Sequence, residues 1–286
     1  MKGFNPEEVE IVHDGKVWEL GDVVGRGGFS YVYLATSSGS EKRLACKVIR
    51  HHWFFLLPGT NNMLRAELEC ASKLHHENIV DILQTYSYPK YTLLLMPLYE
   101  LGSLQRYLWS HEANLDLTHI RCIFRQMTDA LQYVHQKGVA HRDIKFENIL
   151  VKGRFSDTHP HFIIALCDFG LSKKVHGLTG SVTGTMYSMA PEVMGGEYYD
   201  PYKADVWSLG VLLYILLREK YPYWKIRYKD IWNHRQINWK GLQVSSEVRH
   251  ILTTVLNICA VCRLTAKDVW RLRWVQEPHP TMSDIQ

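Results

Sequence analysis

Apolar residues follow two different spacings along the chain. Residues 44–49 and 92–99 are apolar almost without interruption, which is the pattern of buried strands. Within residues 120–137 the apolar side chains instead recur at helical spacing, which predicts an amphipathic helix, and Gly138 supplies its C-terminal stop. The longest apolar run, 206–217, is too short to span a bilayer and predicts a buried core helix. The chain therefore combines buried strands with helices around a sizeable core.

Two pairs of strands are predicted to form hairpins. Gly25, Gly27 and Gly28 lie at the turn of the first hairpin, where glycine permits positive φ and lets backbone amides approach a phosphate. Taken alone, this glycine pattern also fits a plain β-turn. The second hairpin joins strands 149–152 and 161–167, and the residues between them are expected to form a long tip.

Composition and charge narrow the class of protein. Of the 286 residues, 46% are apolar and 22% are charged, which is typical of a globular chain. This length fits one large domain or two lobes that share a cleft. The net charge is only +4 and no basic stripe is present, so we expect no nucleic-acid partner. No apolar run follows Lys2, so we expect no signal peptide, no membrane contact and a location in the cytosol or nucleus.

Six cysteines without a secretory signal predict reduced thiols. Cys259 and Cys262 form a CxxC pair, but no second CxxC lies near it and a structural zinc site needs four ligands. The surrounding sequence, ILTTVLNICAVCRL, is apolar and helix-like. We therefore interpret the pair as buried helix cysteines.

The residues with the clearest chemistry lie in the sequence HRDIKFEN, residues 141–148, and in a later DFG. Asp143 can take the proton of a hydroxyl group, and Lys145 can steady a phosphoryl group during transfer. Asn148 and Asp168 offer the hard oxygen ligands that Mg²⁺ prefers. This spacing indicates a site for a nucleotide, its metal and a hydroxyl acceptor.

A single charge, Lys47, lies within the apolar stretch 44–49. Burying an unpaired charge is costly, so this lysine requires an acidic partner. Glu67 and Glu69 lie in a helical pattern further along the chain, where they would face different sides of the helix.

Taken together, these motifs resemble the eukaryotic protein kinase family, whose catalytic loop reads HRDxKxxN and whose metal-binding turn reads DFG. The resemblance implies an α+β, bilobal fold, with a small, mainly antiparallel N-lobe containing one key helix and a larger, mainly helical C-lobe. The boundaries that it implies are an N-terminal lead-in at 1–17, a kinase domain at 18–275 (N-lobe 18–96, hinge 97–101, C-lobe 102–275) and a short tail at 276–286.

The same resemblance assigns the catalytic roles. It selects Glu67 over Glu69 as the partner that holds Lys47 against the α- and β-phosphates of ATP. Asp143 would orient and deprotonate the acceptor, and Lys145 would stabilise the transferring group.

Nucleotide and metal binding are assigned in the same way. Asn148 and Asp168 would hold Mg²⁺. The full set of nucleotide- and metal-binding residues that the resemblance implies is Gly25, Gly27, Gly28, Val32, Ala45, Lys47, Met96, Pro97, Tyr99, Asn148, Leu150 and Asp168.

Residues 168–192, here called the activation segment, are rich in hydroxyls and glycine, as a regulated loop would be. Thr179, Ser181 and Thr183 are candidate phosphorylation sites for an upstream kinase. Ser181 occupies the position usual in the family, where a phosphate would meet Arg142. A segment ordered without phosphate is the alternative.

Two further pairings come from the resemblance. Glu192 and Arg263 resemble the family's buried ion pair, and Asp205 is expected to bind the backbone of the catalytic loop. His141 is expected to pack under the phenylalanine of DFG.

The implied activity is a serine/threonine protein kinase, closest in pattern to the calcium/calmodulin-dependent and testis-specific groups. Its implied partners are protein substrates, and we expect a monomer. The alternative is a pseudokinase that binds nucleotide or partners and signals by shape alone. Such proteins usually lose the strand lysine or one of the two key aspartates, whereas Lys47, Asp143 and Asp168 are all present here. Phosphorylation of a small molecule is disfavoured by the APE motif that ends at Glu192, because in this family it bounds a peptide platform.

Overall fold

A computed structural model of the chain forms two compact units. One unit comprises residues 1–75 and 80–100, and the other comprises 76–79 and 101–286. The residues that the structure describes are 4–6, 9–27, 30–51, 68, 73–110, 115–156, 159–174, 177–196, 198–223 and 237–277, with only the backbone described at 154–156, 159–162 and 173–174.

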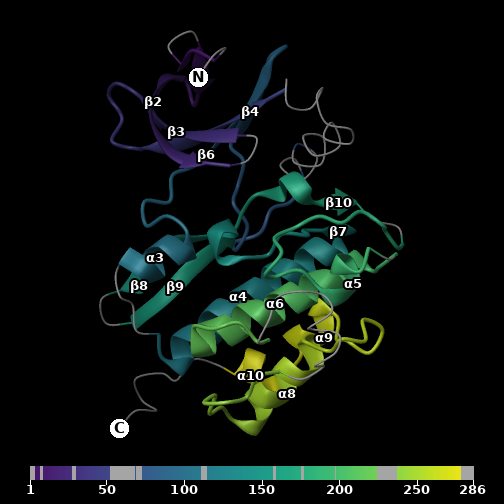
Figure 1. The fold of residues 1–286 in the computed structure, drawn as a ribbon. Coiled ribbons are helices and arrows are strands. Elements are labelled where there is room, and N and C mark those ends of the chain that lie inside the picture. The colour runs from purple at the N-terminus through teal and green to yellow at the C-terminus, as the bar shows by residue number, and fades with distance from the viewer. Residues whose placement is uncertain are drawn as a thin grey trace. The chain divides into compact units, whose positions relative to one another are not determined.

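The described part of the first unit is built on a six-stranded antiparallel sheet with the order β1-β2-β3-β4-β6-β5 (Figure 1). Its strands are β1 (Ile11–His13), β2 (Lys16–Arg26), β3 (Ser30–Thr36), β4 (Leu44–Arg50), β5 (Gln84–Ser87) and β6 (Tyr91–Pro97). Trp18, Tyr33, Val48 and Leu95 meet in the core on one face. The two apolar stretches predicted as buried strands are confirmed as β4 and β6.

The first strand lies within residues 1–17, which were expected to be a lead-in. β1 pairs with β2, so that Ile11 lies opposite Trp18. Ile11 is fully buried in the same core cluster as Trp18. This part of the chain is therefore integral to the sheet.

The second unit is mainly helical in its described residues. Its helices are α3 (Leu104–Ser110), α4 (Leu117–Gln136), α5 (Pro191–Met194), α6 (Pro201–Arg218), α8 (Ser246–Val255), α9 (Ala266–Trp270) and α10 (Arg273–Gln276). Its strands and 3-10 turns are β7 (Val139–Ala140), η2 (Phe146–Asn148), β8 (Ile149–Ser156), β9 (His159–Leu166), η3 (Phe169–Leu171) and β10 (Lys173–Lys174).

Helices α4 and α6 run side by side at the centre of this unit (Figure 1). α4 begins at the N-cap Asp116, whose side chain accepts the backbone N–H of His119, and buries Phe124, Met127 and Leu131. α6 is apolar on most of its circumference and is buried along nearly its whole length, as expected for a core helix. α4 confirms the prediction made from apolar spacing, and α6 confirms the prediction made from the longest apolar run.

The second hairpin is longer than predicted. Its strands were expected to be 149–152 and 161–167, with a tip at 153–160. Instead β8 and β9 continue to the pair Ser156 and His159. Register shifts after Val151 and Arg154 let the ladder continue past Gly153, a residue that ordinarily weakens a strand.

The CxxC pair is also placed differently from the prediction. Cys259 and Cys262 are exposed and lie in a turn between α8 and α9, so their assignment as buried helix cysteines was wrong. The helix stops at Val255, and the Asn257 side chain then accepts the backbone N–H of Cys259. In turns, an asparagine side chain commonly forms such hydrogen bonds with nearby backbone groups, and these bonds compete with the hydrogen bonds of a helix. The apolar Val261 is accordingly 89% exposed.

No helix among the described residues has both the length and the apolar character needed to cross a bilayer.

Candidate active site

Predicted nucleotide-binding residues of the first unit lie on four adjacent strands, β2, β3, β4 and β6. Gly25 of β2 pairs with Val32 of β3, and Val32 pairs with Lys47 of β4. Ala45 of β4 pairs with Met96 of β6. Because side chains of one strand alternate between faces, Ala45 and Lys47 point to the same face of the sheet.

The turn between β2 and β3 is closed by a bond from the Gly27 N–H to the Ser30 carbonyl, 2.9 Å long. A Cβ on Gly27 would lie 2.8 Å from Ser30 Oγ, so a larger residue would require the serine hydroxyl to rotate away. Gly28 lies outside the described residues, and so does Glu67, the predicted partner of Lys47. Pro97 ends β6 opposite Leu44, and Tyr99 follows it.

In the second unit, Asp205 near the start of α6 fixes the catalytic loop, residues 141–148. Its two carboxylate oxygens accept the backbone N–H groups of His141 and Arg142 at 2.8 and 2.7 Å. Oδ2 of Asp205 also lies 2.9 Å from His135 Nε2. Arg142 has a φ of 68°, a strained value for a non-glycine residue. The expectation that Asp205 binds this backbone is confirmed.

His141 serves as a buried support for the loop. Its Nδ1 lies 3.2 Å from the backbone N–H of Asp143, and its Nε2 lies 3.0 Å from the Cys167 carbonyl. The first contact makes Nδ1 an acceptor, so Nε2 carries the proton and donates to Cys167. The ring packs edge-on against Phe169, with centroids 4.8 Å apart. The predicted packing under the DFG phenylalanine is confirmed.

The side chain of Asp143 is buried and bound by three other groups. The amide nitrogen of Asn148 donates to Asp143 Oδ2 at 3.0 Å, and Lys145 Nζ lies 2.8 Å from the same oxygen. The Thr185 hydroxyl donates to Asp143 Oδ1 at 2.7 Å and accepts from Lys145 Nζ at 2.8 Å. The carboxylate is therefore held in one orientation, with an alcohol already bonded to one of its oxygens.

Thr185 was not predicted as a partner of Asp143. It lies 42 residues away in the sequence, and no local pattern reports such a contact. Asp143, Lys145 and Asn148 were predicted to act together, and the structure places them in one network.

The predicted metal ligands are also in the second unit. The N–H of Cys167, the residue before Asp168, donates to the Asn148 carbonyl at 2.9 Å, which links the two ligand segments. Asp168 adopts a left-handed conformation with a φ of 63° and is exposed. Asn148 uses its amide nitrogen on Asp143, which directs its amide oxygen elsewhere.

This donor set fits Mg²⁺. It consists of one amide oxygen and one carboxylate, both hard ligands, and Mg²⁺ takes few protein ligands because it keeps most of its waters. Within the described residues no cluster of three or more His, Cys, Asp or Glu side chains could hold a metal. Leu150, the remaining predicted nucleotide contact in this unit, lies in β8 opposite Ala165.

The sequence model of the protein kinase domain matches residues 18–275 of the chain. The chain belongs to the protein kinase family. The two described units, a mainly antiparallel β unit and a mainly helical unit, accordingly form an α+β kinase fold.

Curated relatives agree with this assignment. The chain is 31% identical over 277 residues to "Protein kinase domain-containing protein ppk9" of Schizosaccharomyces pombe, covering 94% of this chain and 49% of that protein. It is 28% identical over 276 residues to bovine "Serine/threonine-protein kinase 33", covering 91% and 55%. It is 29% identical over 272 residues to rice "CBL-interacting protein kinase 25", covering 90% and 51%. The chain thus spans about half the length of the relatives it matches.

The kinase's activation segment contacts the catalytic loop through Arg142. The guanidinium donates from Nε to the Leu171 carbonyl and from Nη1 to Ser181 Oγ, both at 2.7 Å. Burial lowers the pKa of Arg142, with the charges of Tyr199 and Asp205 acting in the opposite direction. The segment is further held by Tyr199, whose hydroxyl donates to the Ser181 carbonyl at 2.7 Å.

Gly184 allows the segment to approach the catalytic loop. Its φ is 117°, and a Cβ there would lie 2.6 Å from the Arg142 carbonyl oxygen. Both the conformation and the clash exclude a larger residue without movement of the backbone.

We predict that Gly184→Ala lowers the local stability of the activation segment where it contacts the catalytic loop. Backbone strain of about 1–3 kcal/mol should raise amide hydrogen exchange around Thr185 by about tenfold or more, measured by mass spectrometry. Gly180→Ala is the matched control, because its Cβ would meet only Tyr198 at an ordinary 3.5 Å. Equal exchange in the two variants would contradict the prediction.

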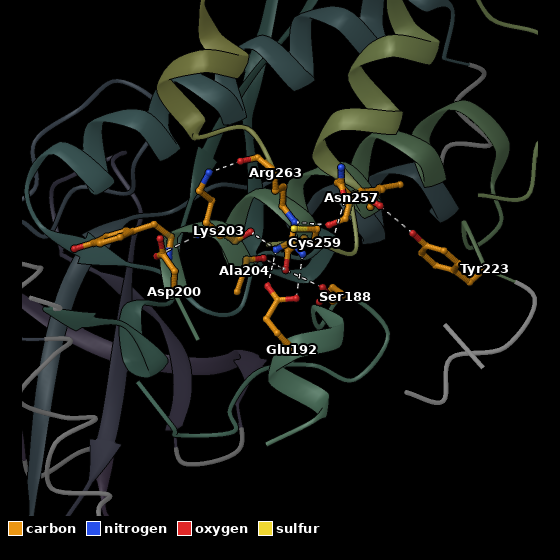
Figure 2. A network of polar contacts seen from close by, with 12 residues as sticks. Ser188, Glu192, Asp200, Lys203, Ala204, Tyr223, Asn257, Cys259 and Arg263 are labelled. Atoms are coloured by element: carbon orange, nitrogen blue, oxygen red, sulfur yellow. Dashed lines mark hydrogen bonds and ion pairs between the residues drawn. The ribbon is translucent and has the colours of Figure 1, made fainter. Parts of the chain in front are cut away.

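The ion pair of Glu192 and Arg263 anchors the C-terminal end of the activation segment (Figure 2). Arg263 donates from Nη1 and Nη2 to the two Glu192 oxygens at 2.6 and 3.0 Å. Its other donors reach the carbonyls of Asn257 and Lys203, and its guanidinium lies 5.0 Å from the ring centre of Trp207. The predicted pair is confirmed, and all three nitrogens of the buried guanidinium donate hydrogen bonds.

Proposed function

We propose that this chain is a serine/threonine protein kinase that transfers the γ-phosphoryl group of ATP to hydroxyl groups of protein substrates. The observation that carries the proposal is the network around Asp143. The Asp143 carboxylate accepts a hydrogen bond from the Thr185 hydroxyl at 2.7 Å, and the ammonium nitrogen of Lys145 lies 2.8 Å from its other oxygen. Both the family and the names of its relatives support this activity.

Asp143 would act as the catalytic base. A substrate hydroxyl would take the kind of position that the Thr185 hydroxyl now shows, donating to a carboxylate oxygen. The amide nitrogen of Asn148 donates to this carboxylate, and the backbone N–H of Asp143 donates to His141 Nδ1. Because both the side chain and the backbone of Asp143 are held, little reorganisation is needed on reaction. Lys145 would place a positive charge beside the transferring phosphoryl group.

Asn148 and Asp168 would hold Mg²⁺, which when bound neutralises charge that develops on the phosphate oxygens. By family resemblance, the glycine-rich segment that contains Gly25, Gly27 and Gly28 would cover the phosphates of ATP, and the ammonium group of Lys47 would contact them. Met96, Pro97 and Tyr99 would contact the adenine. By family resemblance, Glu67 would hold Lys47 in place.

The activity can be tested with purified protein, γ-labelled ATP, Mg²⁺ and an array of peptides. We expect label on serine- or threonine-containing peptides and none on small-molecule alcohols. A pseudokinase would bind nucleotide without transferring label. Label that appears only on small molecules would contradict a protein substrate.

We further propose that phosphorylation of Ser181 by an upstream kinase stabilises the active arrangement. Ser181 is exposed, and its Oγ lies 2.7 Å from Arg142 Nη1, so a phosphate there would meet a positive charge directly. Thr179 is 4% exposed and pairs with Tyr199 through the backbone, which makes it a poor phosphate acceptor. Among the three candidates, the contact with Arg142 favours Ser181.

The expected result is that phosphorylation raises peptide kinase activity about tenfold, which corresponds to about 1.4 kcal/mol from new charge-assisted hydrogen bonds. Ser181→Ala should abolish this increase, while the neighbouring Thr183→Ala should keep it. Activity would be compared before and after phosphatase treatment. An increase that survives in Ser181→Ala would reject Ser181 as the site.

A further inference from the structure

The turn that carries Arg263 also presents two thiols to solvent. Cys259 and Cys262 are both exposed, and a hydrogen bond of 3.0 Å joins their sulfur atoms. Figure 2 shows Cys259 beside Arg263. By contrast, Cys46 and Cys122 are buried. The proposed phosphoryl transfer does not use the exposed pair.

The backbone of this turn is already closed in a way that brings the thiols together. The Cys259 carbonyl accepts the N–H groups of Cys262 and Arg263, both at 3.1 Å. The N–H of Cys259 is in turn held by Asn257 Oδ1 at 2.9 Å. The two sulfur atoms therefore need to approach by only about 1 Å to reach the bonding distance of about 2.05 Å.

The two thiols are also unequal in reactivity. The hydrogen bond shared with the Cys262 thiol, and then backbone hydrogen bonds to Cys262 and Val261, lower the pKa of the Cys259 thiol; the charge of Arg263 acts in the same direction, and burial opposes them. The same thiol–thiol bond raises the pKa of Cys262. Because the thiolate is the nucleophile, Cys259 is the attacking group and Cys262 the resolving one.

We propose that Cys259 and Cys262 are an oxidation site. Hydroperoxides oxidise the two thiols to a reversible disulfide between Cys259 and Cys262. The Cys259 thiolate attacks one oxygen of hydrogen peroxide, the O–O bond breaks, and the other oxygen leaves as water after gaining a proton. Cys259 is then a sulfenic acid. Cys262 gives up its proton and attacks that sulfur, so that the S–S bond forms and the hydroxyl leaves as a second water. The dithiol thereby loses two electrons, and the peroxide is reduced.

This site lies next to the anchor of the activation segment but apart from the chemistry proposed for Asp143. The oxidised turn keeps the backbone hydrogen bonds to the Cys259 carbonyl, so Arg263 can retain its contacts with Glu192. The proposal therefore does not depend on kinase activity and is tested on the thiols themselves.

The test treats the full-length chain with hydrogen peroxide, alkylates the remaining thiols and maps them by mass spectrometry without reduction. We expect a peptide that contains a Cys259–Cys262 disulfide, formed at least about tenfold faster than any oxidation of Cys46 or Cys122. Burial raises the pKa of the Cys46 thiol to about 12, which makes it an internal control. Dithiothreitol should restore both thiols.

Two variants test the order of events. In Cys262→Ser the sulfenic acid on Cys259 should persist and be trapped by a 1,3-dione reagent, whereas Cys259→Ser should show no trapping at position 262. Because both side chains are exposed, serine should leave the fold intact, as far-ultraviolet circular dichroism would verify. Oxidation of the pair no faster than that of Cys46, or disulfides found only between two chains, would overturn the proposal.

Discussion

Asp143→Asn is expected to lower kcat for peptide phosphorylation by roughly 10²-fold or more. Asparagine keeps the size of the side chain and an acceptor oxygen for the Thr185 hydroxyl, but it cannot take up a proton. The bonds from Asn148 and Lys145 show that this carboxylate is fixed within one network, so the loss falls on the chemical step. The measurement is steady-state kinetics with a peptide identified on the array.

Two controls separate chemistry from folding in this variant. ATP affinity, measured by calorimetry, should change little, because Asp143 is assigned to the acceptor and not to the nucleotide. Glu247→Gln removes an equivalent charge from an exposed position at the start of α8 and should leave kcat unchanged. Turnover of Asp143→Asn near that of the wild type would reject Asp143 as the base.

Arg263→Ala is expected to destabilise the second unit by about 3–5 kcal/mol, because it leaves the Glu192 carboxylate without its buried partner. The Arg263 side chain is 0% exposed and makes a bidentate pair with Glu192. It also bonds the carbonyls of Asn257 and Lys203, which would lose a donor. Urea unfolding followed by tryptophan fluorescence measures the change, since Trp207 packs against this guanidinium.

The matched control for this variant is Arg273→Ala. The Arg273 side chain is 83% exposed and lies 3.4 Å from Glu277, so its loss should change stability by less than about 0.5 kcal/mol. A double variant, Glu192→Leu with Arg263→Met, should regain part of the loss because no unpaired charge remains. Similar effects of Arg263→Ala and Arg273→Ala would show that the buried pair does not anchor the segment.

Local sequence patterns predicted the elements whose spacing repeats over many residues. α4 was found because its apolar residues recur over several turns, α6 because it contains the longest apolar run, and β4 and β6 because they are almost wholly apolar. β1 was missed because three residues are too few for a period, although Ile11 is fully buried. The exposed turn at Cys259 was missed because apolar composition does not report where a helix stops.

Resemblance to the family predicted pairings that spacing alone cannot. The contacts of His141 with Phe169 and of Glu192 with Arg263 were expected and are present. The bond from Thr185 to Asp143 was not expected, because it depends on how the activation segment folds back over 42 residues. The pairing of Lys47 with Glu67 stays a prediction, since Glu67 lies outside the described residues.

The most direct test of the account is a single-turnover reaction of the purified chain with γ-labelled ATP, Mg²⁺ and a serine peptide, followed by phosphoamino-acid analysis. We predict that label moves to phosphoserine in the wild-type reaction and that Asp143→Asn transfers it at least about 10²-fold more slowly. Saturable ATP binding without any transfer, or equal transfer by the two proteins, would contradict the central claim that Asp143 makes this chain a working kinase.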